Sequence, residues 1–495
     1  MPDAIRRRRG TLDRLPRSSD QREAAISSAV KHAPATVISA REAERVLGTA
    51  LSRGGEWAEL FWERHHTVTL TLDDDKIEEA IIGVDQGAGI RIRVGERQNF
   101  ANANIADTDD LMTLAARAAA SVAEDTETER VQLRPDDVPR THDVLVDPRT
   151  VPIPRKVALL RRGNDVARAT DPRIHQVTVY YGESIQDVVI ASSDGRYRTD
   201  TRVRTNFALI AVAKQGEVLE SGFEAIRTSR GFETLTDETI DDCARTAARR
   251  ATKNVDAEPA PAGTYTVVLS AEAGGTLVHE SVGHGLEADL NLRGMSVYSG
   301  RIGEQVASPL ITVIDDGTDP GQRGTAALDD EGTQTQRTVL IENGILRTYM
   351  SDRKHARLLG IPESGNARRQ SFRHLPICRM TNTLIAPGES DPAEILASVE
   401  DGIFVRKMGG GQVDVVSGNF AFEVTESYRI RDGRLAEPLR GATLVGQGPK
   451  LMSEIDMVGR DLGYSTGTCG KDGQGAPVAD AQPTLRIPSV VIGGR

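Results

Sequence analysis

A short segment, residues 277–287, contains two histidines and two glutamates in an arrangement typical of metal-dependent hydrolases. His279 and Glu280 are adjacent, and His284 completes the pattern HExxxH. In sites of this kind two neutral imidazoles bind zinc, and the glutamate beside the first histidine acts as a general base toward water. The segment therefore predicts a metal centre with His279 and His284 as ligands and Glu280 as the catalytic carboxylate.

The spacing of the two histidines places a condition on the helix that carries them. They stand five residues apart, whereas the common zinc-protease motif places its histidines four apart. An ideal α-helix turns by about 500° over five residues, which would leave the two rings about 140° apart. A π-bulge would bring the rings back into line. We therefore predict a locally widened helix between His279 and His284, eased by the flanking Gly283 and Gly285.

A catalytic zinc site needs a third protein ligand, and two residues are candidates. Glu287 lies three residues after His284, on a neighbouring stripe of the same predicted helix. Cys469 lies near the C-terminus in a glycine-rich segment beside Lys471, where a thiol can ionise to the zinc-binding thiolate. The residue types leave both candidates open, together with the interpretation of Cys469 as a loop cysteine without a role.

The elements that must position these residues predict an α+β fold of two domains. The chain has 495 residues, which exceeds the size that a single hydrophobic core usually supports. A Pro- and Ala-rich segment over residues 256–263 is the best candidate linker. We predict a disordered basic extension over residues 1–37, an N-terminal α+β domain over residues 38–255 and a C-terminal domain over residues 256–495. The C-terminal domain is expected to be strand-rich and to carry the metal-binding helix.

Local patterns indicate where helices and strands begin. Ser39 and Glu42 form a capping-box pattern before a first amphipathic helix. Helical spacing returns over residues 109–122, 155–169 and 237–253. Alternating runs, such as residues 68–72, 90–94 and 264–269, indicate strands, and the first two are expected to be half exposed.

Composition argues against several functional classes. The formal net charge of −11 argues against a general nucleic-acid surface, and no apolar run is long enough to span a bilayer. The three cysteines, Cys243, Cys378 and Cys469, form no disulfide framework and favour a reducing compartment. We therefore expect a cytoplasmic protein without nucleic-acid or membrane partners, in which Cys243 is structural.

Three segments together resemble the TldD/PmbA family of metalloproteases, and specifically its catalytic TldD-like branch. They are residues 279–289, 329–346 and 467–474, and the resemblance covers nearly the whole chain from about Ile38 onward. It implies a zinc ion (Zn2+) held by His279, His284 and Cys469, with Glu280 as the catalytic carboxylate and Glu287 outside the ligand set. The PmbA-like branch is expected to lack the HExxxH pattern, which this chain retains.

These observations predict a zinc-dependent metallopeptidase that hydrolyses small or unfolded peptides. Strand-rich walls would bind an extended peptide at a sheet edge. The resemblance indicates the same substrates, including leader peptides, and implies a dimer, either with a PmbA-like partner subunit or with a second copy of the chain. Two alternatives remain: a zinc amidohydrolase acting on non-peptide amides, and a non-enzymatic peptide-binding or regulatory subunit whose metal is structural, closed by four protein ligands.

Overall fold

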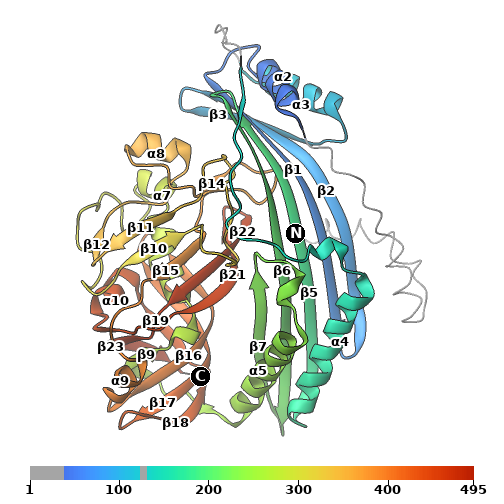
Figure 1. Cartoon of the computed structure of the whole chain (residues 1–495). Coiled ribbons are helices and arrows are strands. Elements are labelled where there is room, and N and C mark those ends of the chain that lie inside the picture. The colour runs from blue at the N-terminus through green and yellow to red at the C-terminus, as the bar shows by residue number, and fades with distance from the viewer. Residues whose placement is uncertain (1–37, 123–130, 495) are drawn as a thin grey trace.

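The computed structural model describes residues 38–122 and 131–494, so the predicted extension over residues 1–37 lies outside the described part of the chain. The described chain is an α+β protein built in two halves, each around its own sheet structure (Figure 1). This arrangement confirms the predicted fold class.

The N-terminal half is a curved, mostly antiparallel sheet with helices on one face. Its elements in chain order are α2 (Ala40–Ala50), β1 (Trp57–Asp73), β2 (Lys76–Val94), β3 (Arg97–Asn104), α3 (Thr108–Ala120), β4 (Arg134–Pro135), η2 (Pro148–Thr150), α4 (Ile153–Thr170), β5 (Ile174–Ser192), β6 (Arg196–Gln215), β7 (Val218–Thr228), η3 (Phe232–Thr234) and α5 (Asp237–Asp256). The strand order is β3-β2-β1-β5-β6, and both β7 and the short parallel strand β4 pair with β6.

The predicted helices of this half are present. The capping box at the start of α2 is confirmed, since the Ser39 backbone N–H donates to the Glu42 carboxylate and the Ser39 hydroxyl accepts from the Glu42 backbone N–H. α3, α4 and α5 begin within two residues of the positions predicted from helical spacing. Their apolar faces pack against the sheet, α2 and α3 near one end and α4 and α5 nearer the other (Figure 1).

Alternation along the long strands gives the N-terminal sheet two different buried faces. On β1 the even-numbered Leu60 and Leu70 pack toward the helices, whereas the odd-numbered Glu59 and Phe61 face the C-terminal half. Because the C-terminal half covers this second face of the N-terminal sheet, the polar side chains on that face are buried as well. Arg91, expected on a half-exposed strand, is only 3% exposed, so that expectation was wrong for this part of β2.

The C-terminal half contains two larger sheets and a short hairpin of two strands. Its elements are β8 (Glu258–Pro259), β9 (Gly263–Leu269), η4 (Ala271–Ala273), α6 (Thr276–Val278), η5 (His279–Gly283), η6 (His284–Leu286), α7 (Ala288–Leu292), β10 (Val313–Asp316), β11 (Arg337–Glu342), β12 (Ile345–Leu346), α8 (Arg353–Leu359), β13 (Ala367–Arg368), β14 (Ile377–Cys378), β15 (Asn382–Ile385), α9 (Pro392–Ala397), β16 (Asp401–Asp414), β17 (Asn419–Arg431), β18 (Arg434–Arg440), β19 (Thr443–Gln447), α10 (Gly448–Glu454), β20 (Met457–Val458), β21 (Gly463–Lys471), β22 (Gln474–Gln482) and β23 (Leu485–Gly493).

The two larger sheets have different topologies. One runs β12-β11-β10-β15-β22-β21 and ends in β21 at its edge. The other runs β16-β9-β23-β19-β17-β18-β8, and because β16 also pairs with β17, five of its strands form a closed ring. The predicted linker is part of this sheet, since Glu258–Pro259 pairs with Leu439–Arg440 of β18. We retain residues 38–255 and 256–495 as proposed domains, joined by a segment that is itself structured.

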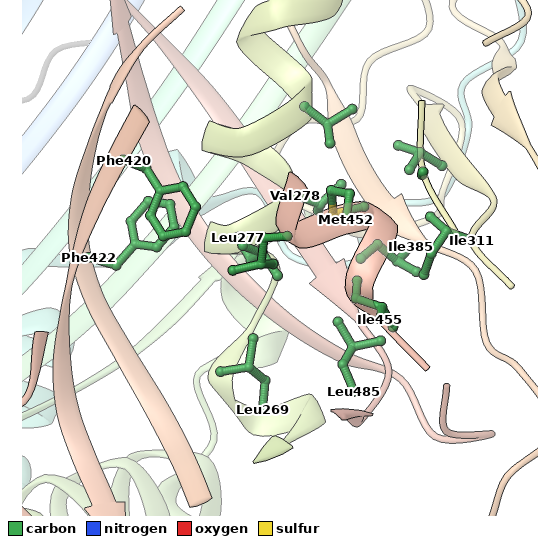
Figure 2. Close-up of a cluster of buried hydrophobic side chains, with 14 of the residues drawn as sticks. Leu269, Leu277, Val278, Ile311, Ile385, Phe420, Phe422, Met452, Ile455 and Leu485 are labelled. Carbon is green, nitrogen blue, oxygen red and sulfur yellow. The ribbon is translucent and has the colours of Figure 1, made fainter. Parts of the chain in front are cut away.

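A hydrophobic cluster joins both sheets of the C-terminal half and anchors the helix that carries the histidine motif (Figure 2). Leu277 and Val278 of α6, immediately before His279, are fully buried in this cluster. Phe420 and Phe422 of β17 stack in the same cluster with ring centroids 4.4 Å apart. Complete burial of one such side chain contributes about 1.5–3 kcal/mol. The core of the domain therefore fixes the backbone position of the first motif histidine.

Buried ion pairs join the two halves through the acidic segment over residues 329–331. Asp330 pairs with Arg202 of β6 at 2.5 Å, and Arg369 pairs with Glu59 of β1 at 2.6 Å. All four side chains are at least nine-tenths buried. The acidic segment therefore contacts the N-terminal sheet.

Candidate metal centre

The histidine motif lies on a helix whose winding changes along its length. Residues His279–Gly283 form a π-helical turn, in which the backbone N–H of His284 donates to the carbonyl oxygen of His279. The predicted widened helix is therefore confirmed. The two imidazole rings lie side by side with centroids 5.1 Å apart and planes at 85°, so both can point toward one position.

The glycines of the motif serve close packing. A Cβ atom on Gly283 would lie 2.1 Å from the sulfur of Met380, and one on Gly285 would lie 2.6 Å from the ring of Tyr298. Gly283 has φ −53, a value that any residue adopts. The expectation that these glycines ease the helical distortion is therefore replaced by a steric reason, since neither site has room for a side chain.

The structure brings Cys469 to the two histidines. The Cys469 sulfur lies 3.2 Å from Nε2 of His279 and 3.2 Å from Nε2 of His284. A tetrahedral zinc ion, with bonds of ~2.3 Å to sulfur and ~2.0–2.1 Å to nitrogen, would separate such atoms by about 3.5 Å. The three donor atoms are therefore of the right type and nearly the right spacing for zinc, and Cys469 is held in place by β21.

Two carboxylates hold the outer nitrogens of the histidines. Asp480 of β22 lies 2.6 Å from Nδ1 of His279, and Glu287 lies 3.3 Å from Nδ1 of His284. Such contacts fix the imidazole tautomer and turn Nε2 toward the ligand position. Glu287 thus lies on the far side of His284 from Cys469. Sequence analysis missed Asp480. The only available signal was its place on a strand, β22, that pairs with the strand carrying Cys469.

Two buried cations support this arrangement from behind. Lys471 Nζ lies 2.9 Å from Glu287 and 2.7 Å from Asp289. Arg379, only 1% exposed, donates to the carbonyl oxygen of Cys469 and, at 3.1 Å, to that of Gln474. Arg379 had no signal in the sequence. Together the two cations fix both the glutamate behind His284 and the backbone of the cysteine.

The electrostatics of the cluster favour a thiolate beside positive charge. Burial alone would raise the pKa of the Cys469 thiol, but hydrogen bonds and charges from His279 and His284 lower it to about 5. Burial opposes the charged form of both histidines, yet their acidic neighbours raise the pKa of His279 well above its ordinary range and that of His284 to about 9. A site that stabilises two positive charges against a thiolate and two carboxylates also suits a divalent cation, which displaces the protons.

Glu280 lies in the cleft that the cluster opens into. This cleft has a volume of about 940 Å³ and is lined by the motif, β21, β16 and part of β7. β21 and β7 are edge strands of their sheets and lie side by side, with Arg227 of β7 donating to the Thr466 carbonyl at 2.9 Å (Figure 1). Burial raises the pKa of Glu280 above its ordinary value, which suits a carboxylate that accepts and returns a proton.

A second group of potential ligands has a different character. Asp352, His355 and Cys378 place their ligand atoms within 4.8 Å of one another in the described part of the chain. Asp352 is the N-cap of α8, accepting from the His355 backbone at 2.7 Å. Burial, and to a smaller extent the negative charge of Asp352, raises the pKa of the Cys378 thiol well above its ordinary value. The group therefore serves as the N-cap of α8, and its thiol lacks the cationic neighbours that favour a thiolate at Cys469.

Comparison with known proteins places the chain in a family. Three domain models match it: "PmbA/TldA metallopeptidase domain 1" over residues 58–122, the central domain over residues 146–255 and the C-terminal domain over residues 262–494. Among the helices of residues 38–122 and 131–494, none has the length and apolar character needed to cross a membrane.

Relatives are similar over most of their length. "Metalloprotease TldD homolog" of Buchnera aphidicola is 36% identical over 89% of this chain and 93% of its own. "Zinc metalloprotease TldD homolog" of Saccharolobus solfataricus is 27% identical over 89% of this chain and 97% of its own length. The crystal structure of TldE from Thermococcus kodakarensis superposes with a TM-score of 0.74 at 18% identity over 92% and 100%, which shows a shared fold. The chain therefore belongs to the PmbA/TldD family and is a metallopeptidase.

Proposed function

We propose that this chain hydrolyses peptide bonds with a zinc ion held by His279, His284 and Cys469. The observation that carries the proposal is the convergence of two imidazole nitrogens and a low-pKa thiol in one cleft with Glu280. Among the described residues the group offers three donors, which leaves a position open, as catalytic zinc sites do and structural ones do not. The name of the S. solfataricus relative supports zinc as the metal.

The roles of the side chains follow from their positions. When bound, zinc supplies Lewis acidity for attack of water on the peptide carbonyl. Glu280 takes the proton from the attacking water and returns one to the leaving amine. Asp480 and Glu287 hold His279 and His284 with Nε2 turned inward, and burial of the cluster keeps these contacts strong.

The substrate we propose is an extended or unfolded peptide, leader peptides included. The cleft is bounded by β21 and β7, whose free edges can pair with a peptide backbone without selecting a sequence. We also propose that the chain works as a dimer, either with a PmbA-like partner or with a second copy.

Zinc content and cleavage of unfolded casein together test this function. Wild type and Glu280→Gln are compared with a control variant, Glu272→Gln, which changes an exposed glutamate of η4. Each protein is assayed with and without a PmbA-like partner. We expect one zinc per chain in all three proteins and cleavage by wild type and Glu272→Gln only. Zinc bound without cleavage by the wild type, even with the partner, would refute the peptidase and favour the non-enzymatic subunit. Hydrolysis of small amides but not of casein would favour the amidohydrolase.

A further inference from the structure

Three arginines meet in the interface between the two halves without a carboxylate partner. Arg204 lies on β6, Arg323 in the segment between β10 and β11, and Arg368 on β13. Within the described ranges their hydrogen bonds go only to carbonyl oxygens. Arg204 Nε donates to Arg323 at 3.3 Å, Arg323 Nε to Gly467 at 3.1 Å, and Arg368 Nη1 to Met380 at 2.6 Å.

The lack of a counter-charge stands out because neighbouring arginines on the same face are paired. Arg202, two residues before Arg204, pairs with Asp330 at 2.5 Å. Arg204 is 8% exposed and Arg368 is 9% exposed, so water compensates little of their charge. A buried guanidinium without a negative partner is costly to keep, and such a cluster is expected to have an anionic partner outside the polypeptide.

The arginines also repel one another. Burial is the larger cause and the charges of neighbouring arginines the smaller one, and together they lower the pKa of Arg204 well below its ordinary value and that of Arg323 to about 10. Asp330 acts in the opposite direction on Arg204, but one of its oxygens accepts from Arg202 and the other from the backbone of Arg369. Asp315, which together with Asp330 acts on Arg368 in the same direction, accepts hydrogen bonds from Asn366, Thr381 and Thr383. Both carboxylates are therefore already engaged.

The cluster keeps a small opening to solvent and lies close to the cleft. The terminal nitrogens of Arg204 and Arg323 donate no hydrogen bond to the described residues, but they are not fully sealed from solvent. Gly467, which accepts from Arg323, lies in β21 between residues that line the cleft, and Arg227 lines it as well. Arg323 therefore lies against the strand that forms one wall of the cleft.

We propose that Arg204, Arg323 and Arg368 form a binding site for a small oxyanion of the phosphate or carboxylate class, between the two halves of the chain. Guanidinium groups bind such anions through pairs of parallel N–H donors. In this site the three guanidinium groups, which come from three separate segments, surround one anion. A bound anion therefore joins the three segments. The site is distinct from the zinc ligands and needs no catalytic step.

Equilibrium dialysis of the full-length, zinc-loaded protein against labelled inorganic phosphate tests the site. We expect saturable binding by the wild type and at least tenfold weaker binding by Arg204→Gln and by Arg368→Gln. Arg368→Lys, which keeps the charge but not the paired donors, should lie between. Arg347→Gln removes an exposed arginine paired with Glu342 and should bind like the wild type.

A thermal measurement separates loss of binding from loss of folding. Millimolar phosphate should raise the unfolding midpoint above that in chloride of equal ionic strength for the wild type and for Arg347→Gln, and not for Arg204→Gln. Absence of saturable binding by the wild type, or equal binding by folded Arg204→Gln, would overturn the proposal.

Competition identifies the source of the anion. Displacement of phosphate by a peptide with a free C-terminal carboxylate, and not by the same peptide as its amide, would assign the site to a peptide terminus. Displacement by neither would assign it to a free anion. Because the readout is anion binding and not hydrolysis, it fails or succeeds independently of the proposed peptidase function.

Discussion

Replacement of Asp480 tests how the site holds its first histidine. Asp480 lies 2.6 Å from Nδ1 of His279, and both residues are buried. Asp480→Asn keeps an acceptor but loses its charge, and a charge-assisted hydrogen bond is roughly twice as strong as a neutral one. We expect about tenfold weaker zinc binding for Asp480→Asn. For Asp480→Ala, which leaves Nδ1 without a partner, we expect about hundredfold weaker binding.

The assay is zinc affinity by competition with a chromophoric chelator. Asp432→Asn, in the exposed turn between β17 and β18, is the matched control and should bind zinc like the wild type. The folded state of each variant is checked by its far-ultraviolet circular dichroism. Zinc affinity of Asp480→Ala within twofold of the wild type would refute the role of this carboxylate in positioning His279.

Three further predictions concern stability. Burial, opposed by weaker hydrogen bonds, raises the pKa of Glu63 from 4.5 to about 7, so the folded state binds more protons than the unfolded state in this window and stability falls as pH rises through it. Between pH 4.5 and pH 7 the wild type should lose up to about 3 kcal/mol more unfolding free energy than Glu63→Gln, measured with urea. Gly283→Ala should destabilise by about 1–3 kcal/mol and reduce zinc affinity, because the new methyl meets Met380 at 2.1 Å. Arg369→Met should destabilise by about 3–5 kcal/mol in the same urea assay, because the change leaves Glu59 with an unpaired buried oxygen.

Matched variants control these stability measurements. Glu79→Gln, at an exposed glutamate of β2, should follow the wild-type pH dependence. Gly410→Ala, where a Cβ atom meets nothing within 4 Å, should leave stability and zinc affinity unchanged within ~0.5 kcal/mol. Arg347→Met breaks an exposed pair and should cost under about 1 kcal/mol. A pH dependence of Glu63→Gln identical to the wild type, or a neutral Gly283→Ala or Arg369→Met, would contradict the corresponding argument.

The local geometry of the motif could be predicted because it depends on residues close in sequence. The five-residue interval between His279 and His284 requires a wider turn if both rings share a ligand, and the structure has that turn. The capping box at Ser39 and the helical spacing of α5 are also properties of a few neighbouring residues. Short-range rules of helix geometry were sufficient for these features.

The surroundings of the site could not be predicted because they depend on strand pairing across long intervals. Asp480 reaches His279 because the helix that begins after Gly275 packs against β22, and Arg379 reaches Cys469 from the segment before β15. The exposure of Arg91 was wrongly predicted because alternation assigns polar residues to solvent, whereas here a second half covers that face. Buried charges are mostly found where they are paired, and pairing is a property of the fold.

The coordination of zinc in the full-length protein tests the central claim most directly. X-ray absorption at the zinc edge should give one sulfur at ~2.3 Å and two imidazole nitrogens at ~2.0–2.1 Å, with the remaining scatterer a light atom from solvent. Cys469→Ser should remove the sulfur, while Cys378→Ser, in the helix-cap group, should leave the spectrum unchanged. A wild-type spectrum without sulfur, or a sulfur that persists in Cys469→Ser, would contradict a zinc site built from His279, His284 and Cys469.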